Sequence, residues 1–321
     1  DNLELKIGNS FMHVDRYLFY NYASAFKKNY NHYMELPTHK VPINLMAKVY
    51  NWFLNGNNQL SLGEDFLAIY EMSKFLGIRR ILEQFWFTFS TSSSLGLWEL
   101  GAYKAYLKAR DMPCSDLMSI LLSRIRKCFL PIVASIEFLQ MNATELSYLF
   151  KLNTICVNSE DEIFFAAVHW LEYDWSQRQE YIVQLMNNVR FRLISPWLQR
   201  SILHQPENNV ISEVGTKDEV KALLWDSCVF GTAALTSKKS PASCDRIIMH
   251  HFSQINGIQR CWVYCPGVPH HHDIKCPNFR PLTYETFKDF LNCLHSYGQQ
   301  FMDSIMYSPQ KQWNKYKCCH N

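Results

Sequence analysis

Cysteine is absent from the first 113 residues of this 321-residue chain, and all eleven cysteines lie between Cys114 and Cys319. An odd number of scattered cysteines differs from the dense, even framework that holds small secreted domains together. We therefore expect reduced thiols, most of them acting as small buried hydrophobes, in a protein that is cytoplasmic, nuclear or both.

The chain also lacks the segments that contact lipid or nucleic acid. No apolar run approaches the roughly 18 residues that a membrane span needs. Basic residues exceed acidic ones by only three, 32 against 29, and no run of five or six like charges forms a basic arm. The sequence thus predicts no membrane partner and no nucleic-acid partner, which leaves other proteins as the expected partners.

Signatures of catalysis are missing as well. The sequence contains no Gly-rich phosphate loop, no Gly-x-Ser-x-Gly elbow and no His-Glu-x-x-His helix. We interpret His169 as a half-buried structural histidine, and the acids at 160 to 162 as residues that favour the positive end of a helix. The expectation is a protein that is not an enzyme and that has no cofactor.

Apolar side chains are abundant, at 48% of the residues, and aromatic ones reach 15%, so the chain can build two or three cores. Residues 3 to 7 alternate between apolar and polar, which predicts a half-buried strand followed by a hairpin. The spacing between residues 16 and 30 is helical. Residues 39 to 43 are predicted as a third strand, with Pro42 at its edge or end.

Helical spacing dominates from residue 45 onward. The polar run "STSSS" at 90 to 94 marks the end of the first unit, and residues 204 to 217 are predicted as a loop. Ser159 and Glu162 have the spacing of a capping box. We expect a mixed, mostly α fold with three parts, which are an α/β domain with a small three-stranded sheet (1–94), an all-helical domain (98–235) and a small α+β region of unknown type (246–321).

Two sets of segments resemble a BTB (POZ) domain followed by a BACK domain, as in the Kelch-like adaptor proteins. The first set is "YASAFKKNYNHYME", "VYNWFLNGNNQLSL" and "FLAIYEMSKFLGIRRILEQFWFTF". The second is "CFLPIVASIEFLQM", similar to the helix pair called the three-box, and "SEDEIFFAAVHWLEYDWSQR" with "VRFRLISPWL", similar to the BACK core. The resemblance covers roughly residues 2 to 203. The residues that match the BACK core are Glu160, Ala167, Trp170, Arg178, Arg190 and Phe191.

The resemblance implies a docking site for the N-terminal domain of cullin-3. Many BTB adaptors place a hydrophobic residue, any residue and a Glu in a loop before a strand, and Tyr33, Met34 and Glu35 match that triplet, with Tyr30 just before it. A ring and a carboxylate that point outward suit a protein partner. The alternative from residue types alone is a solvated acid at Glu35 and a core aromatic at Tyr33.

The three-box resemblance implies that the cullin arm enters a groove between BTB and BACK. Ile132, Val133 and Ile136 are candidates to line that groove. The competing interpretation is that these side chains belong to the core, since apolar residues at helical spacing usually do.

The C-terminal region contains a possible zinc site. If "CWVYC" is extended, Cys261 and Cys265 lie about 13 Å apart at roughly 3.3 Å per residue, too far to share one zinc ion. A site from Cys265, His270 or His272, and Cys276 is geometrically easier. The alternative is a packed aromatic-rich region with a surface histidine cluster, and no metal.

Kelch-type propellers show Gly-Gly pairs at about 50-residue spacing, and this chain has no Gly-Gly pair. The predicted function is a non-catalytic substrate adaptor of a cullin-3 ubiquitin ligase, in which residues 246–321 are a possible module for a protein substrate. The alternatives are an oligomerising BTB scaffold in transcriptional or cytoskeletal control, and a zinc-dependent activity in the C-terminal third. The resemblance also implies a possible homodimer through the BTB domain.

Overall fold

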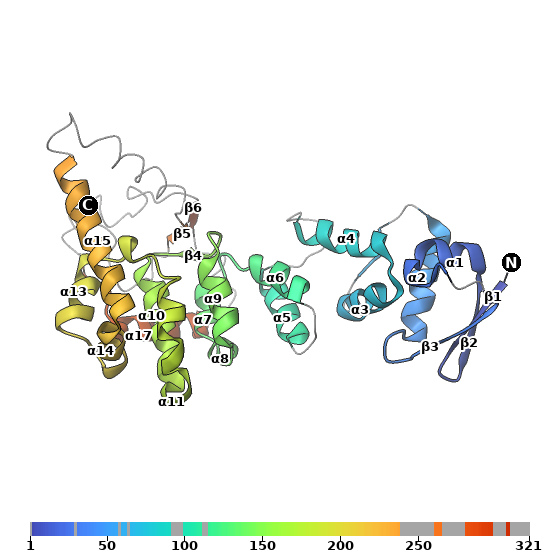
Figure 1. Cartoon of the computed structure of the whole chain (residues 1–321), viewed down its shortest axis with the longest axis horizontal. Coiled ribbons are helices and arrows are strands. Elements are labelled where there is room, and N and C mark those ends of the chain that lie inside the picture. The colour runs from blue at the N-terminus through green and yellow to red at the C-terminus, as the bar shows by residue number, and fades with distance from the viewer. Residues whose placement is uncertain are drawn as a thin grey trace. The chain divides into compact units, whose positions relative to one another are not determined.

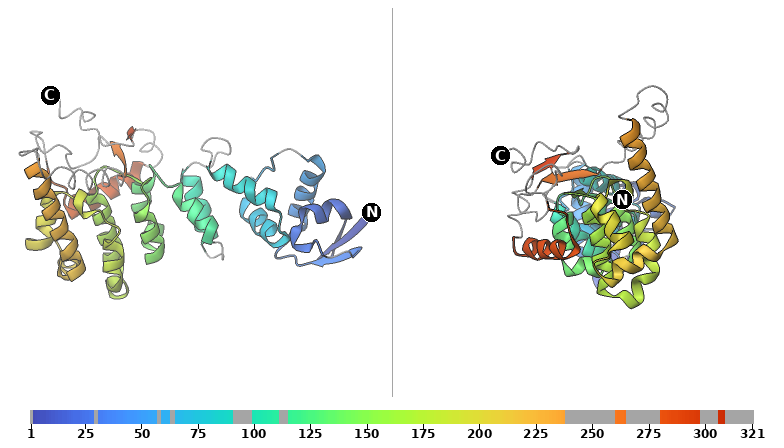
Figure 2. Two further views of the ribbon diagram at one scale, coloured as in Figure 1. Left: turned by 45° about the horizontal axis from the view of Figure 1, so that its top comes forward. Right: turned by 90° about the vertical axis from the view of Figure 1, so that its left-hand side faces the viewer.

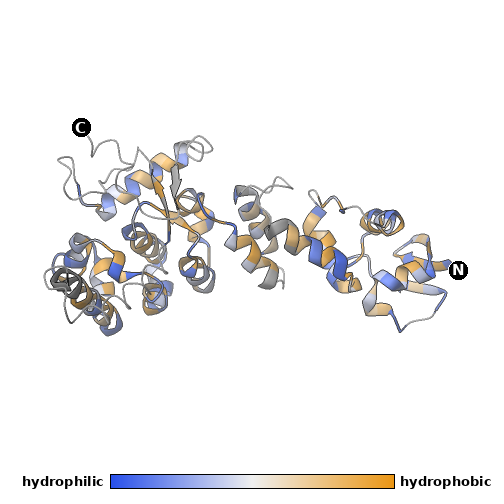
Figure 3. Ribbon diagram, turned by 90° about the horizontal axis from the view of Figure 1, so that it is seen from above, coloured by the Kyte–Doolittle hydropathy of each residue, from blue (hydrophilic) through white to orange (hydrophobic). Residues whose placement is uncertain are grey.

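The computed structural model describes residues 2–28, 31–56, 59–62, 65–90, 99–110, 115–237, 260–264, 280–297 and 306–308. It divides into two compact units, Asp1–Leu121 and Leu122–Asn321 (Figure 1). Both units bury apolar side chains between their elements, and the apolar stripes of the helices are visible in Figure 3.

The first unit begins with a three-stranded sheet, whose strands are β1 (Asn2–Ile7), β2 (Ser10–Asp15) and β3 (Tyr33–Leu36), in the order β2-β1-β3. The hairpin of β1 and β2 is antiparallel, and β3 pairs with β1 in parallel. The predicted first strand is confirmed. The prediction of a third strand at 39 to 43 is wrong, because the strand lies at Tyr33–Leu36 and residues 38 to 40 form a turn before α2.

The described residues of the first unit also form helices, of which the first lies between β2 and β3: α1 (Arg16–Tyr22), α2 (Ile43–Asn55), α3 (Phe66–Leu76), α4 (Arg79–Ser90), α5 (Glu99–Ala109) and α6 (Ser115–Ser123). The predicted helix 16–30 is shorter than expected, because α1 ends at Tyr22 and a single 3-10 turn follows. Gly77 ends α3 with a φ of 71°, a left-handed conformation that glycine adopts without steric cost. The division between the units falls inside α6.

The second unit is built mainly from helices. They are α7 (Phe129–Val133), α8 (Ile136–Leu139), α9 (Ala143–Lys151), α10 (Asp161–Tyr173), α11 (Trp175–Arg178), α12 (Ile182–Met186), α13 (Pro196–His204), α14 (Asn209–Thr216) and α15 (Asp218–Ser237). Helix α10 is its centre, because nearly every residue from Asp161 to Leu171 is buried. The prediction of a loop over 204–217 is wrong, because α14 lies inside it with Asn208 as its N-cap.

The described residues of this unit also contain a second small sheet and helix α17. Strands β4 (Cys156–Val157), β5 (Cys261–Tyr264) and β6 (Met306–Ser308) pair in the order β4-β5-β6, and α17 (Tyr284–Tyr297) lies beside the helices (Figure 2). The rings of Tyr284 and Phe287 pack against Phe165 of α10, with centroids 5.7 and 5.8 Å away. The hydroxyl of Tyr284 also donates to Glu172 at 2.6 Å.

The predicted fold class is confirmed. The molecule is mostly helical, with a small three-stranded N-terminal sheet and a helical second unit. The strand predicted at "CWVYC" is present as β5. The helix predicted from Tyr284 to Met306 ends earlier, at Tyr297, and Met306 begins β6.

Candidate functional site

The outer face of the first sheet carries the N-terminal candidates. Inner-face residues such as Met34 and Leu36 are buried, whereas Tyr33 and Glu35 alternate with them and are exposed. The register places Tyr33 beside Glu4, and Glu35 beside Lys6. On the other side of β1, His13 is opposite Glu4 and Phe11 is opposite Lys6. We call these six side chains, at positions 4, 6, 11, 13, 33 and 35, the sheet face.

Glu35 on the sheet face forms an ion pair with Lys6 at 3.1 Å. The hydrogen bond from Lys6 and the charge of Glu35 raise the pKa of the lysine. The carboxylate is still 61% exposed, so the pair sits in solvent and contributes little to stability. A partner that takes up Glu35 has to compete only with this weak contact.

The position of the triplet differs from the prediction. Tyr33, Met34 and Glu35 were expected in a loop, and they lie in strand β3, so the expected loop is wrong. The ring of Tyr33 is 45% exposed, which excludes the core alternative for that residue. Met34 points inward and is buried. The ring and the carboxylate therefore face solvent together because they are two residues apart on a strand. Tyr30 lies outside the described residues.

The three-box candidates lie at the start of the second unit. Ile132 and Val133 of α7 are buried, as are Phe129 and Phe138, so these four side chains are core residues. The candidate assignment of Ile132 and Val133 to a partner surface is corrected here, because neither is accessible for direct contact. Ile136, at the start of α8, is 50% exposed and remains a candidate.

Trp170 and Arg178, which are two of the BACK positions, make contacts within the second unit. The guanidinium of Arg178 lies 4.1 Å from the centroid of the Trp170 ring. It donates to the carbonyls of Trp170 and Leu139 at 2.7 and 2.6 Å. The indole N–H of Trp170 donates to the carbonyl of Met141 at 2.8 Å. These contacts tie α8 to α10, so the two residues stabilise the helical packing.

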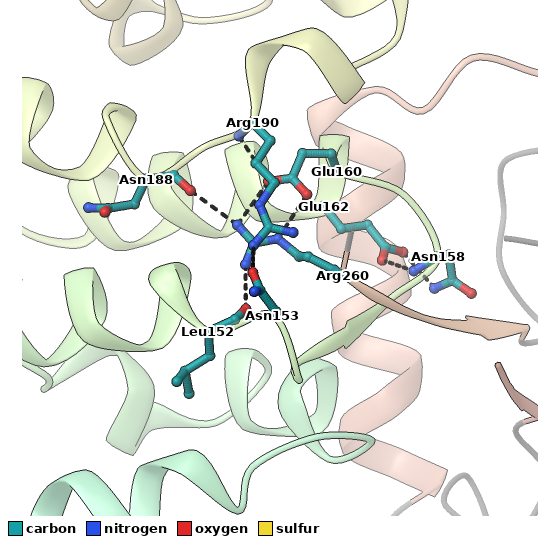
Figure 4. A network of polar contacts seen from close by, with 8 residues as sticks. All are labelled: Leu152, Asn153, Asn158, Glu160, Glu162, Asn188, Arg190 and Arg260. Atoms are coloured by element: carbon teal, nitrogen blue, oxygen red, sulfur yellow. Dashed lines mark hydrogen bonds and ion pairs between the residues drawn. The ribbon is translucent and has the colours of Figure 1, made fainter. Parts of the chain in front are cut away.

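A buried cluster of polar side chains surrounds Glu160 (Figure 4). Its carboxylate accepts from Nε and Nη2 of Arg260 at 2.8 and 2.9 Å, and both side chains are fully buried. Arg260 also donates to the carbonyls of Leu152 and Asn188 at 2.8 and 3.1 Å. The backbone N–H of Arg190 is a third donor to Glu160, at 3.0 Å.

The charges of this cluster affect the pKa of Arg190. Burial and the nearby charge of Arg260 lower its pKa to about 10, and the charge of Glu160 opposes that shift. Its side chain donates to Asn153, whose carbonyl accepts from the backbone of Cys261 at 3.1 Å. The cluster thus joins the loop before α10, the segment after α12 and the start of β5. Its role is structural, because Glu160 and Arg260 bind each other and nearby backbone groups, although Nη1 of Arg190 is buried without a hydrogen-bond partner.

The helix start at α10 also differs in detail from the prediction. The N-cap is Glu160, and Ser159 makes no capping hydrogen bond, so the predicted Ser159 capping box is wrong. Glu162 instead accepts from the backbone and the side chain of Asn158, both at 2.7 Å. Asp161 accepts from the backbone of Ser195 at 2.7 Å. The three acids therefore fix loops, and no carboxylate pair for catalysis is present among them.

His169 is half-buried on α10, and its pKa is lowered from the ordinary value of 6.5. Burial is the main cause, the charge of Lys288 acts in the same direction, and Glu172 opposes it. This agrees with the interpretation of His169 as a structural histidine.

The metal candidates Cys265, His270, His272 and Cys276 lie outside the described residues. Within the ranges that the structure describes, no group of three His, Cys, Asp or Glu side chains is arranged to hold a metal ion. In those same ranges, none of the helices combines the length and the apolar content needed to cross a bilayer.

Comparison with known proteins gives two family matches. Residues 102–204 match the family described as BTB And C-terminal Kelch (BACK). Residues 213–305 match a family described only as a domain of unknown function (DUF4734). The second match spans α15, β5 and α17, which are the elements that complete the second unit.

Relatives among known proteins are Kelch-like. Kelch-like protein 7 of Gallus gallus is 33% identical over 99 residues, which are 30% of this chain and 17% of that protein. Kelch-like protein 28 of Homo sapiens is 30% identical over 87 residues, or 27% and 15% of the two chains. Kelch-like protein 2 of Rattus norvegicus is 30% identical over 81 residues, or 25% and 14%.

The BACK match therefore begins near the end of the first unit and continues into the second, and the chain is similar to Kelch-like proteins over less than a third of its length. The matched part spans less than a fifth of each relative described here. This supports the predicted Kelch-like resemblance. The assignment of residues 1–94 as a BTB domain and the boundaries of the three predicted domains stay predictions.

Proposed function

We propose that this protein is a non-catalytic adaptor of a cullin-3 ubiquitin ligase, which docks on the cullin through the sheet face and the start of α8 and presents a protein substrate. The observation that carries the proposal is the BACK match over residues 102–204 together with Kelch-like relatives. Kelch-like proteins of the BTB-BACK type are typically adaptors of this kind.

The proposed docking residues are Tyr33 and Glu35 of the sheet face, with Tyr30 beside them in sequence, and Ile136 in the second unit. An exposed aromatic ring and an exposed carboxylate on one rigid strand suit a hot spot for a protein partner. Met34 supports the strand from its buried side. The protein substrate, a homodimer and a location in the cytoplasm or nucleus belong to the same proposal.

A direct binding measurement with the purified cullin-3 N-terminal domain tests the docking site. Glu35→Lys should weaken binding about 30-fold, which corresponds to about 2 kcal/mol for a hot-spot residue. The matched control is Asp65→Lys, because Asp65 is also an exposed acid in a lysine pair, 3.9 Å from Lys48 and 56% exposed. The control should bind like the wild type.

Two outcomes separate the alternatives. If Glu35→Lys does not change the affinity for the cullin domain, the proposed docking residues are refuted, and the adaptor function is not. Absence of any wild-type binding at micromolar concentrations favours the scaffold function. One observation favours that second candidate, namely that the triplet lies within a strand and Glu35 already has Lys6 as a partner.

A further inference from the structure

Two cysteines lie opposite each other on neighbouring strands of the second unit. Cys156 of β4 is in register with Cys261 of β5 in a parallel pair. Registered residues of adjacent strands have Cα atoms roughly 4.8 Å apart and point to the same face of the sheet. Disulfides need a Cα separation of about 4.4 to 6.8 Å. Neither cysteine is part of a disulfide in this structure.

The surroundings hold the two residues in this register. The backbone N–H of Cys261 donates to Asn153 at 3.1 Å, and the backbone N–H of Cys156 donates to Arg126 at 3.0 Å. Arg260, directly before Cys261, is fixed by its buried contacts with Glu160. Val263, two residues further along β5, is buried. The backbone on both sides of the pair is thus anchored, so a bond needs little rearrangement.

The two thiols differ in access to solvent. Cys156 is fully buried, and its thiol lies 3.4 Å from the carbonyl of Thr154, to which it donates. Cys261 is partly exposed. A small oxidant in solution therefore meets Cys261 first, while Cys156 is shielded and has Cys261 as its strand neighbour. Among the five cysteines that the structure describes, no other two are joined by a strand register.

We infer that Cys156 and Cys261 are a redox-modification site, at which a peroxide converts the dithiol into a reversible disulfide that fastens β5 to β4. The sulfur of Cys261 attacks the O–O bond of hydrogen peroxide, which gives a sulfenic acid and one water. The sulfur of Cys156 then attacks the sulfenic sulfur. The S–S bond forms, the S–O bond breaks, and the thiol proton of Cys156 leaves with that oxygen as a second water.

The electrons balance in this sequence, because two thiols lose two electrons and one peroxide gains them. A cellular dithiol reverses the reaction by thiol-disulfide exchange. The bond closes a loop of more than one hundred residues, and a link across a long loop restricts the unfolded chain most strongly. Oxidation should therefore stabilise the second unit. This inference is independent of the proposed ligase function.

The test treats the full chain with graded hydrogen peroxide, blocks remaining thiols with iodoacetamide, and maps peptides by mass spectrometry without reduction. The expected result is a Cys156–Cys261 cross-linked peptide that disappears on treatment with dithiothreitol. The midpoint of thermal unfolding should rise by about 5 °C on oxidation. Cys261→Ser should abolish the cross-link and the shift, whereas Cys293→Ser, on the exposed side of α17, should keep both.

Two results would overturn the inference. One is recovery of Cys156 and Cys261 in alkylated form after treatment that oxidises the exposed thiols of Cys228 and Cys293. The other is a disulfide that joins Cys261 to a different cysteine. Because the peptide map is made on the wild-type chain, the result does not depend on whether the Cys261→Ser variant folds.

Discussion

Arg260 is a residue whose replacement should strongly affect stability. Its guanidinium and the carboxylate of Glu160 are both fully buried, so removal of one leaves the other as an uncompensated buried charge. Arg260→Met should lower the free energy of unfolding of the second unit by about 3 to 5 kcal/mol. Chemical denaturation followed by far-ultraviolet circular dichroism measures this loss.

The control for that prediction is Arg280→Met, because Arg280 is an exposed arginine of the same C-terminal part. It should change stability by less than about 0.5 kcal/mol. The double variant Glu160→Gln with Arg260→Met should lose less than the sum of the two single variants, since the partners act as a unit. Simple additivity of the two losses contradicts the direct pair.

His169 should make stability depend on pH. Its folded pKa lies below the unfolded value of 6.5, so the unfolded chain binds the proton more tightly. The free energy of unfolding should therefore be unaffected by this group above pH 6.5 and should fall as the pH drops through that value toward the folded pKa. Urea unfolding at pH 7.5 and 5.5 measures the difference.

His169→Gln should reduce this dependence on pH. Burial is the main cause of the lowered pKa of His169, Glu172 of α10 opposes it, and Lys288 of α17 acts in the same direction as burial. An equal response of wild type and His169→Gln shows that another group is responsible.

At the residue scale, the sequence predicted some roles and missed others. The spacing of "SEDEIFFAAVHWL" correctly placed acids at a helix start, and the core positions of α10 follow from its apolar content. The Glu160–Arg260 pair was missed, because its partners are 100 positions apart and nothing local marks Arg260. The sequence offered one signal, because Glu160 lies next to an apolar segment that predicts burial, and a buried acid needs a partner.

Among the elements, the turn after α3 gives a sharp test of a glycine. A Cβ at Gly77 would lie 2.6 Å from Ser24 Oγ and 2.8 Å from the backbone nitrogen of Ala25. The hydroxyl of Ser24 already donates to the carbonyl of Gly77 at 2.6 Å. Gly77→Ala should therefore lower the free energy of unfolding by about 2 kcal/mol or more, because alanine disfavours the left-handed conformation and its Cβ would clash with the neighbouring atoms.

Gly56, at the end of α2, is the matched control. It also has a positive φ, 64°, but a Cβ there meets nothing within 4 Å. Gly56→Ala should lower the free energy of unfolding by only about 1 kcal/mol, because alanine disfavours the left-handed conformation but meets no clash there. Thermal unfolding of the two variants in parallel measures the difference, and equal losses contradict the close approach at Gly77.

The elements that the sequence misplaced are those set by distant partners. Strand β3 alternates over only four residues, and it is a strand because it pairs with β1, some thirty residues earlier. Helix α14 follows Pro206 and two asparagines, which are turn signals, yet Asn208 caps it and Val210, Ile211 and Val214 are buried. Long amphipathic helices were predictable because their pattern is local.

For the whole molecule, the structure predicts that the second unit needs its C-terminal part. A chain that ends at Ser237 lacks Arg260, β5 and α17, so Glu160 loses the guanidinium of Arg260, and the ring of Phe165 loses its contact with Phe287. It should unfold at least about 10 °C lower than the full chain, or fail to stay soluble. A chain that ends at Ser308 keeps every described element and is the control.

Calorimetry on the three chains measures this prediction, and an unchanged unfolding temperature for the chain that ends at Ser237 contradicts it. The result also bears on the substrate module. Sequence patterns separated residues 246–321 from the helical domain, because a polar segment intervenes and the texture changes there. Strand β5 pairs with β4, which lies far from it in the sequence, and no local pattern reveals such a pairing.

The distance along the chain between Glu160 and Arg260 also has a consequence for biosynthesis. A ribosome releases residue 160 well before residue 260, at about 5 to 20 residues per second, so for several seconds the nascent helices carry an acid whose counterion has not yet been made. Completion of this unit is therefore expected only after residue 260 has left the ribosome. Chains released early by a premature stop codon would go to chaperones and proteases.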